Sequence, residues 1–272
     1  MLSKQNNVYV LGNGESRKNI DVNHLKTLGK VYGCNAIYRD IKVDALVCVD
    51  AGMSHEIYKS NYAKDNVCYF KQWSPLPAEI LFNFTASNIF KDTEIIENER
   101  NDRESFVCHG TNAEMYDELL DEGLQLVSDK EDFKIKMKEK RTFITWLDLQ
   151  DKVETISEEY DGWSTGPIAV RIAVEKEKPD NVFLLGFDLK SNDGKINNLY
   201  KGTDNYYPSD SKEIYSGNWI NQHSVNFKLF PDVNFIRVVP DEINSNAISS
   251  EVDEWKQFEN IRHATLDKFK DL

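Results

Sequence analysis

The chain has 272 residues, of which 40% are hydrophobic and 29% charged, and this composition is typical of a folded protein with a sizeable core. The formal net charge of −13 repels nucleic-acid phosphates, so we expect no nucleic-acid partner. No apolar run approaches the roughly 20 residues that span a bilayer, and the first residues do not follow the signal-peptide pattern. We therefore expect a cytoplasmic protein with no transmembrane segment.

The first seventy residues alternate short apolar runs with polar crossovers, a pattern that favours an α/β fold with a mainly parallel sheet. We predict a helix or loop over 16–28. The predicted strands are "NVYVLG" at 7–12, "KVYGCN" at 30–35, "DALVCVD" at 44–50 and "NVCYF" at 66–70. Cys34, Cys48, Cys68 and Cys108 form no CxxC pair, and three of them lie in apolar runs, which predicts buried free thiols in a reducing compartment.

The middle of the chain, 73–160, contains prolines, a lysine-rich run and many acidic residues. Its periodicity is weak, so we predict a helical or irregular insertion that serves as a substrate-facing lid, or else a solvated helical excursion. The whole chain, 1–272, is then a single domain that carries this insertion.

Regular structure is predicted again from Ser164 or Thr165, either of which can cap a helix that Pro179 ends. Pro167 suits the first turn of that helix. The elements predicted after it are a strand at 181–188, a helix at 219–230, a strand at 233–239 and a polar amphipathic helix at 249–272.

Polar residues follow three of the predicted strands: Gly12-Asn13-Gly14, then Asn35, then Asp50. In open parallel sheets ligands bind outside the carboxyl ends of the strands, so these residues are candidates for one ligand crevice. Arg17 stands where the dinucleotide fingerprint requires a third glycine, which disfavours an ordinary NAD site. A tight turn without a ligand, and an Asp50 that caps a turn with Gly52, are the alternatives.

The sequence favours a metal-free reaction. The five histidines are scattered without a zinc spacing, and "VCVD" is not the paired-carboxylate motif of metal-dependent sugar transferases, so we expect no metal and no cofactor. His223 lies before an apolar helical run and is a candidate general base near neutral pH. A partly buried helix histidine is the alternative.

Five segments occur in the order and rough spacing of a known family: "VYVLGNGES", "GCNAIYRD", "ALVCVD", "STGPIAVRIAVEKEKPDNVFLLGFDL" and "HSVNFKLFPDVNFIRVV". They resemble the bacterial sialyltransferases that modify lipooligosaccharide. The resemblance covers the first seventy residues and roughly 162–240, and leaves the middle unmatched. It implies a Rossmann-like, GT-A-like glycosyltransferase that moves sialic acid or a related sugar from a CMP-activated donor to a glycan or glycolipid hydroxyl, with inversion and without a metal.

The resemblance also implies residue roles. Asn13 and Asn35 match family asparagines near the nucleotide and phosphate, and Asp50 stands where the family has an asparagine at the ribose. His223, followed by Ser224, matches the proposed catalytic base. The expected donor-binding set is Gly12, Asn13, Gly14, Ser16, Asn35, Asp50, Ser164, Thr165, Gly166 and Asp188, with Thr165 and Gly166 on the cytidine side.

The sequence departs from the family after Asp188. The family neutralises the leaving phosphate there with two tyrosines, but Leu189 and Lys190 stand where the first is expected. Lys190 can supply positive charge instead. Tyr200 is the candidate for the second tyrosine, with Tyr206 or Tyr207 as substitutes.

Two other functions stay open. One is a pterin pyrophosphokinase-like enzyme that uses ATP and magnesium and recruits Asp50 and Asp188. The other is an inactive nucleotide-binding module of the same fold. A homo-oligomer is compatible with each of these functions.

Overall fold

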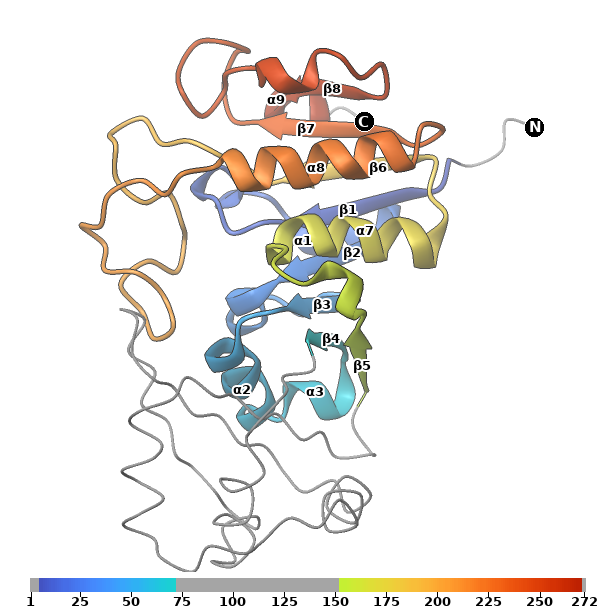
Figure 1. Ribbon diagram of the computed structural model, residues 1–272, viewed down its shortest axis with the longest axis vertical. Helices are drawn as coiled ribbons and strands as arrows, with labels where there is room; N and C mark the ends of the chain where they lie inside the picture. The colour runs from blue at the N-terminus through green and yellow to red at the C-terminus, as the bar shows by residue number, and fades with distance from the viewer. Residues whose placement is uncertain (1–4, 72–151, 271–272) are drawn as a thin grey trace, which may run out of the picture. The chain divides into compact units, whose positions relative to one another are not determined.

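The computed structural model describes residues 5–71 and 152–270. They form one mainly parallel sheet flanked by helices, which confirms the predicted α/β, Rossmann-like fold class (Figure 1). The strand order is β5-β4-β3-β2-β1-β6-β7-β8. Within the described residues, no helix is both long and apolar enough to cross a membrane.

The chain divides into two compact units, 1–47 with 159–272, and 48–158. β3 (Ala45–Cys48) ends at this boundary. The first unit contains β1 (Asn7–Leu11), α1 (Val22–Leu28), β2 (Lys30–Cys34), α7 (Thr165–Glu177), β6 (Asn181–Leu185), α8 (Gly217–Leu229), β7 (Asn234–Val239), β8 (Ile261–Thr265) and α9 (Leu266–Lys270). The second contains α2 (Ala51–Lys59), α3 (Tyr62–Asp65), β4 (Val67–Lys71) and β5 (Val153–Ile156).

The central strands β1 and β6 are apolar runs that are buried almost throughout, as expected for parallel strands covered on both faces. They pair with Tyr9 opposite Phe183, and the two rings stack with centroids 5.1 Å apart. Phe269 of α9 packs against both rings, at 6.1 Å from Tyr9 and 5.4 Å from Phe183. The C-terminal helix therefore covers part of this central pair.

The order of the strands reverses at β1. From β1 the chain adds β2 and β3 on one side, whereas β6, β7 and β8 extend the sheet on the other. In open α/β sheets the crevice outside the carboxyl ends of the strands at such a reversal is the usual place for a ligand. The residues that follow β1, β2 and β6 are therefore candidates for a ligand-binding site.

α7 forms where the sequence predicts a helix. Ser164 precedes its first residue in extended conformation, and Pro167 occupies the first turn without needing an N–H donor. The apolar side of α7 is buried, and the helix packs against β1, β2 and α8. It ends at Lys178, which takes the left-handed conformation (φ 48°), before Pro179.

Two boundary predictions were wrong. The predicted helix at 249–272 is instead a 3-10 turn (Asp253–Trp255), β8 and α9. β8 pairs in parallel with β7, so the backbone donors and acceptors along that side of β7 outweigh local helix preference. The predicted insertion at 73–160 ends too late, because β5 is the edge strand of the sheet and pairs with β4. Residues 73–151 lie outside the described part of the chain.

Three of the cysteines confirm the prediction of buried free thiols: Cys34, Cys48 and Cys68. Burial raises the pKa of Cys34 to about 12, against the opposing charge of Arg17, so this thiol stays protonated at neutral pH. Cys108 lies outside the described residues.

Candidate functional site

The turn after β1 is held against the turn after β6. Gly12 N–H donates to Leu185 O at 2.8 Å, and Gly14 N–H donates to Gly186 O at 2.9 Å. A Cβ on Gly12 would lie 2.5 Å from Gly186 O, and one on Gly14 would lie 2.4 Å from Asp188 Cγ. Both glycines are therefore required by close packing of the chain on itself, whatever ligand the turn also meets.

Asn13 lies between these glycines and is hydrogen-bonded on both sides of its amide. Its Oδ1 accepts from Arg17 Nη2 at 3.2 Å, which orients the amide. Its Nδ2 then donates to Cys34 O at 3.1 Å and to the Tyr206 hydroxyl oxygen at 3.0 Å. Asn13 thus links the ends of β1 and β2 to the loop that carries Tyr206.

Arg17 is a site residue that sequence reasoning missed. Its side chain is only 5% exposed, and it donates to Gly12 O at 2.6 Å and to the Tyr200 hydroxyl at 3.1 Å. Burial raises the pKa of Tyr200 to about 12, with Arg17 opposing the rise. The only sequence signal was an arginine in the polar stretch after β1, which is also typical of an exposed residue.

Asn35 and Thr165 are brought together, as the sequence predicts for one crevice. Thr165 Oγ1 donates to Asn35 Oδ1 at 3.1 Å. Asn35 takes the left-handed conformation (φ 52°), which asparagine tolerates better than most residues. Ser164 N–H donates to Gln222 Oε1 at 2.9 Å, and a Cβ on Gly166 would lie 2.9 Å from the Phe187 ring. The start of α7 is therefore fixed beside the end of β2.

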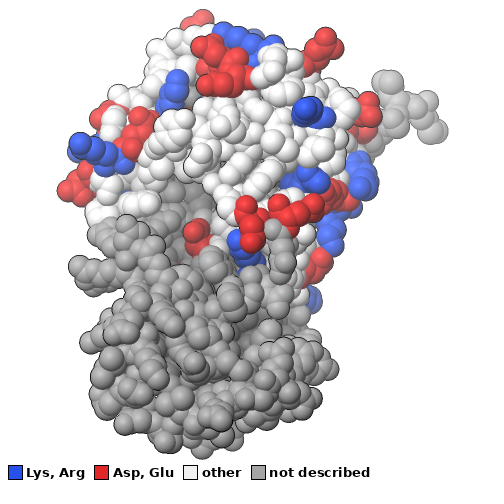
Figure 2. All heavy atoms as spheres, viewed as in Figure 1, with Lys and Arg blue, Asp and Glu red and all other residues white. Residues whose placement is uncertain are grey.

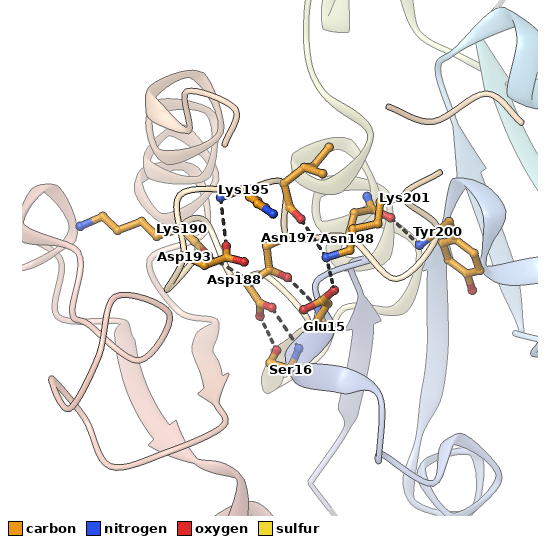
Figure 3. A network of polar contacts seen from close by, with 11 residues as sticks. Glu15, Ser16, Asp188, Lys190, Asp193, Lys195, Asn197, Asn198, Tyr200 and Lys201 are labelled. Atoms are coloured by element: carbon orange, nitrogen blue, oxygen red, sulfur yellow. Dashed lines mark hydrogen bonds and ion pairs between the residues drawn. The ribbon is translucent and has the colours of Figure 1, made fainter. Parts of the chain in front are cut away.

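Asp188 and Ser16 form a second link between the two turns, drawn in Figure 3. Ser16 N–H donates to Asp188 Oδ2 at 3.0 Å, and the Ser16 hydroxyl donates to Asp188 Oδ1. Burial raises the pKa of Asp188, and the Ser16 hydrogen bonds oppose that rise. This carboxylate therefore already serves to hold the chain together.

Lys190 and Tyr200, the pair predicted at the leaving phosphate, are not brought together. In Figure 3 the Lys190 side chain extends away from the side of the network where Tyr200 lies. Lys190 instead lines a separate cavity of about 160 Å³ between the Asp188 turn and residues 247–254, beside Arg237. Tyr200 belongs to the Arg17 group, with Tyr206 next to it at 5.7 Å between ring centroids.

His223 is enclosed rather than open to the crevice. The residue is 0% exposed and lies among the rings of Phe187, Phe227 and Trp255, with centroids 5.1, 6.1 and 5.8 Å away. Within the described part of the chain, neither ring nitrogen has a hydrogen-bond partner. Burial, and secondarily the charge of Arg237, lowers the pKa of His223 to about 3, which makes it a weak base.

Asp50 precedes α2 at the start of the second unit. Its predicted place at the ribose, beside the asparagines, stays a prediction.

The described surface offers no single charged patch on the face seen in Figure 2. Acidic and basic side chains are interspersed there, with an uncharged area where α8 lies. Over residues 5–71 and 152–270, no group of three or more His, Cys, Asp or Glu side chains is placed to hold a metal ion. Comparison with protein-family models, curated proteins and solved structures finds no match for this chain.

The burial of His223 predicts a loss of stability in acid. An unfolded histidine titrates near pH 6.5, so as the pH falls the unfolded state binds the proton first. Above about pH 6.5 the titration of His223 does not change the free energy of unfolding. As the pH falls from 6.5 towards the folded pKa of His223, the free energy of unfolding decreases by up to about 1.4 kcal/mol per pH unit. We expect the free energy of unfolding, measured with urea, to depend less on pH between 6.5 and 4.5 in His223→Phe than in the wild type.

The control for this measurement is His24→Phe, because His24 is exposed on α1. Part of the slope should remain in His223→Phe, since burial also lowers the pKa of His263 to about 4. An unchanged slope in His223→Phe would contradict the enclosed, uncharged state of the ring.

Proposed function

We propose that this chain is a glycosyltransferase that takes its sugar from a CMP-activated donor and binds the nucleotide at the carboxyl ends of β1 and β2. The observation that carries the proposal is the convergence of Asn13, Asn35 and Thr165 at this edge, through the contacts of Asn13 with Cys34 O and of Thr165 with Asn35. Neutral amides and a hydroxyl recognise a base, ribose or phosphate by hydrogen bonds alone.

The positive charge for the leaving phosphate would come from arginine. Arg17 is buried beside Asn13, and Arg39 lies over the rings of Tyr200 and Tyr206, at 5.8 and 6.0 Å from their centroids. When the acceptor oxygen attacks the anomeric carbon, the bond to the phosphate oxygen breaks and CMP leaves as an anion. A fixed cation and the Tyr200 hydroxyl, to which Arg17 donates, stabilise the developing charge on that oxygen.

His223 is left out of the proposed chemistry. With no exposed surface and a pKa of about 3, its ring does not reach an acceptor hydroxyl in this structure. That observation favours a second candidate, a nucleotide-binding module of the same fold without transferase activity. The two candidates differ in one measurement, the release of CMP from CMP-sialic acid in the presence of glycan acceptors.

Ligand-induced thermal stabilisation tests the nucleotide part of the proposal. We expect CMP without metal to stabilise the protein by about 2.7 kcal/mol when the CMP concentration is 100 times its Kd. UDP and NAD should not stabilise it. Stabilisation by ATP with magnesium alone would point instead to the pyrophosphokinase-like function. That function would need Asp188 as a metal ligand, although both its carboxylate oxygens accept from Ser16.

Two asparagine variants give the matched control. Asn35 and Asn244 are both left-handed, at φ 52° and 66°, so an alanine at either position strains the backbone similarly. Asn35→Ala should remove the CMP-induced stabilisation, whereas Asn244→Ala should keep it. Loss of the CMP effect in both variants would mean that it does not arise at the strand ends.

A further inference from the structure

The hydroxyl oxygen of Tyr206 receives two hydrogen bonds from the ends of two different strands. Asn13 Nδ2 donates to it at 3.0 Å, and the backbone N–H of Ala36 donates to it at 3.3 Å. Asn13 follows β1 and Ala36 follows β2, so the two donors converge at the edge of the sheet where ligands bind in this fold class. Tyr206 itself is 193 residues away from Asn13 in sequence, in the loop between β6 and α8.

The other hydrogen bonds of Asn13 belong to the core of the unit. Arg17 fixes its Oδ1, and Cys34 O takes one Nδ2 proton. The second Nδ2 proton is the one that points to Tyr206. If Tyr206 moved away, Asn13 and Ala36 would each present one N–H to whatever replaced its oxygen.

Arg17 supplies positive charge near that oxygen, and Asp40 adds negative charge at the neighbouring Tyr200. Arg17 is only 5% exposed, and the acceptors it meets among the described residues, Gly12 O, Asn13 Oδ1 and Tyr200 Oη, are neutral oxygens. Its positive charge is therefore not neutralised by those partners. A negatively charged oxygen accepting from the same donors would form charge-assisted hydrogen bonds, which are stronger than those to a phenol oxygen.

Arg39 holds the loop in place. Its Nη1 donates to Thr203 Oγ1 at 2.7 Å and its Nη2 donates to Asp204 O at 3.0 Å. Its guanidinium also lies over the Tyr206 ring, 6.0 Å from the centroid. Because Arg39 ends the same 3-10 turn that contains Ala36, the residue that holds the loop and one of the two donors are on one short segment.

We propose that Tyr206 occupies the subsite of a ligand phosphate oxygen, so that the loop at 200–207 acts as an internal plug that the nucleotide must displace. The inference rests on the proposed function, because it takes the ligand to be a nucleotide phosphate. The plug competes with the ligand for the same donors. Because Arg39 holds the loop in place, its hydrogen bonds to the loop strengthen this competition. A tyrosine that stays in place and donates to the bound phosphate would have the opposite effect on affinity.

Calorimetric titration with CMP separates these two roles of Tyr206. Tyr206→Phe removes the oxygen that competes with phosphate, and a typical hydrogen bond is worth about 1 kcal/mol, so we expect CMP to bind about fivefold more tightly. The control is Tyr215→Phe, at an 80% exposed tyrosine of the same loop, which should leave the affinity unchanged. If the wild type binds CMP, unchanged or weaker binding by Tyr206→Phe would overturn the plug.

Two further measurements separate failure of the plug from failure of the proposed function. Hydrogen exchange at the Ala36 amide should be faster in Tyr206→Phe than in the wild type without any ligand. Inorganic phosphate should bind Tyr206→Phe more tightly than the wild type. If phosphate does so and CMP binds neither protein, the proposed function fails and the plug stands. If neither ligand binds Tyr206→Phe, the plug is overturned.

Discussion

Replacing Arg237 with methionine is expected to lower the free energy of unfolding by about 3–5 kcal/mol. The guanidinium is 2% exposed and donates to four backbone carbonyls: Phe187 at 2.9 Å, Ser250 at 2.8 Å, Asp188 at 3.2 Å and Ile248 at 2.7 Å. Burial lowers its pKa to about 10, with Asp188 opposing, so it stays charged at neutral pH. Methionine fills similar space and leaves those carbonyls without their donor.

Urea unfolding at pH 7 measures this loss, with Arg262→Met as the matched control. Arg262 is exposed on the neighbouring strand β8, so its replacement should change stability by no more than about 0.5 kcal/mol. Hydrogen exchange should also quicken in residues 247–256 of Arg237→Met, since Arg237 ties Ile248 and Ser250 to the turn after β6. A loss below about 1 kcal/mol would mean that the four carbonyls find other partners.

Gly12→Ala is expected to destabilise the protein by about 3 kcal/mol or more, at the upper end of what overpacking costs. The added methyl group would lie 2.5 Å from Gly186 O and 3.1 Å from Gly186 C, so backbone rather than a flexible side chain must move. That movement also strains the hydrogen bond from Gly12 N–H to Leu185 O. We therefore expect Gly12→Ala to weaken the contact between the turns after β1 and β6.

Gly162→Ala separates this clash from backbone strain. Gly162 has φ 78°, and no atom of the described residues lies within 4 Å of an added Cβ, so alanine there costs the left-handed conformation, about 1–2 kcal/mol. The denaturation midpoint of Gly12→Ala should be clearly lower than that of Gly162→Ala. Equal midpoints would mean that the turns after β1 and β6 separate easily, and that the glycine serves a ligand more than the packing.

The sequence located most of the fold because local composition carried the signal. The buried strands β1, β2, β3, β4, β6 and β7 are short apolar runs that polar residues bound. α7 follows a serine, a residue type common before helices, and has a proline in its first turn and another after its end, although the Ser164 side chain makes no capping hydrogen bond. β8 could not be predicted in this way. Its residues alternate only weakly between buried and exposed positions. It becomes a strand because its backbone pairs with the outer edge of β7.

Part of the candidate site could be predicted for a geometric reason. In a parallel sheet the carboxyl ends of neighbouring strands meet at one edge, so polar residues after successive strands come together whatever the details of packing. Asn13, after β1, contacts the end of β2 in this way. Thr165 comes from the start of α7 instead, and it donates to Asn35 directly. The resemblance to sialyltransferases used these same positions, and the CMP titration tests what they bind.

By itself the sequence determined most of the strands and helices, with β5 and β8 as exceptions, and the edge at which the polar residues gather. Tertiary structure alone decided which charged and aromatic side chains enter the interior. Arg17 and Arg237 look like ordinary surface residues in sequence, but both are buried, where Arg17 donates to the Tyr200 hydroxyl and Arg237 donates to the Phe187 carbonyl. His223 lies on a helix that the sequence predicts, yet rings from the turn after β6, from α8 and from the C-terminal segment enclose it, because packing fixes which side of the helix is buried.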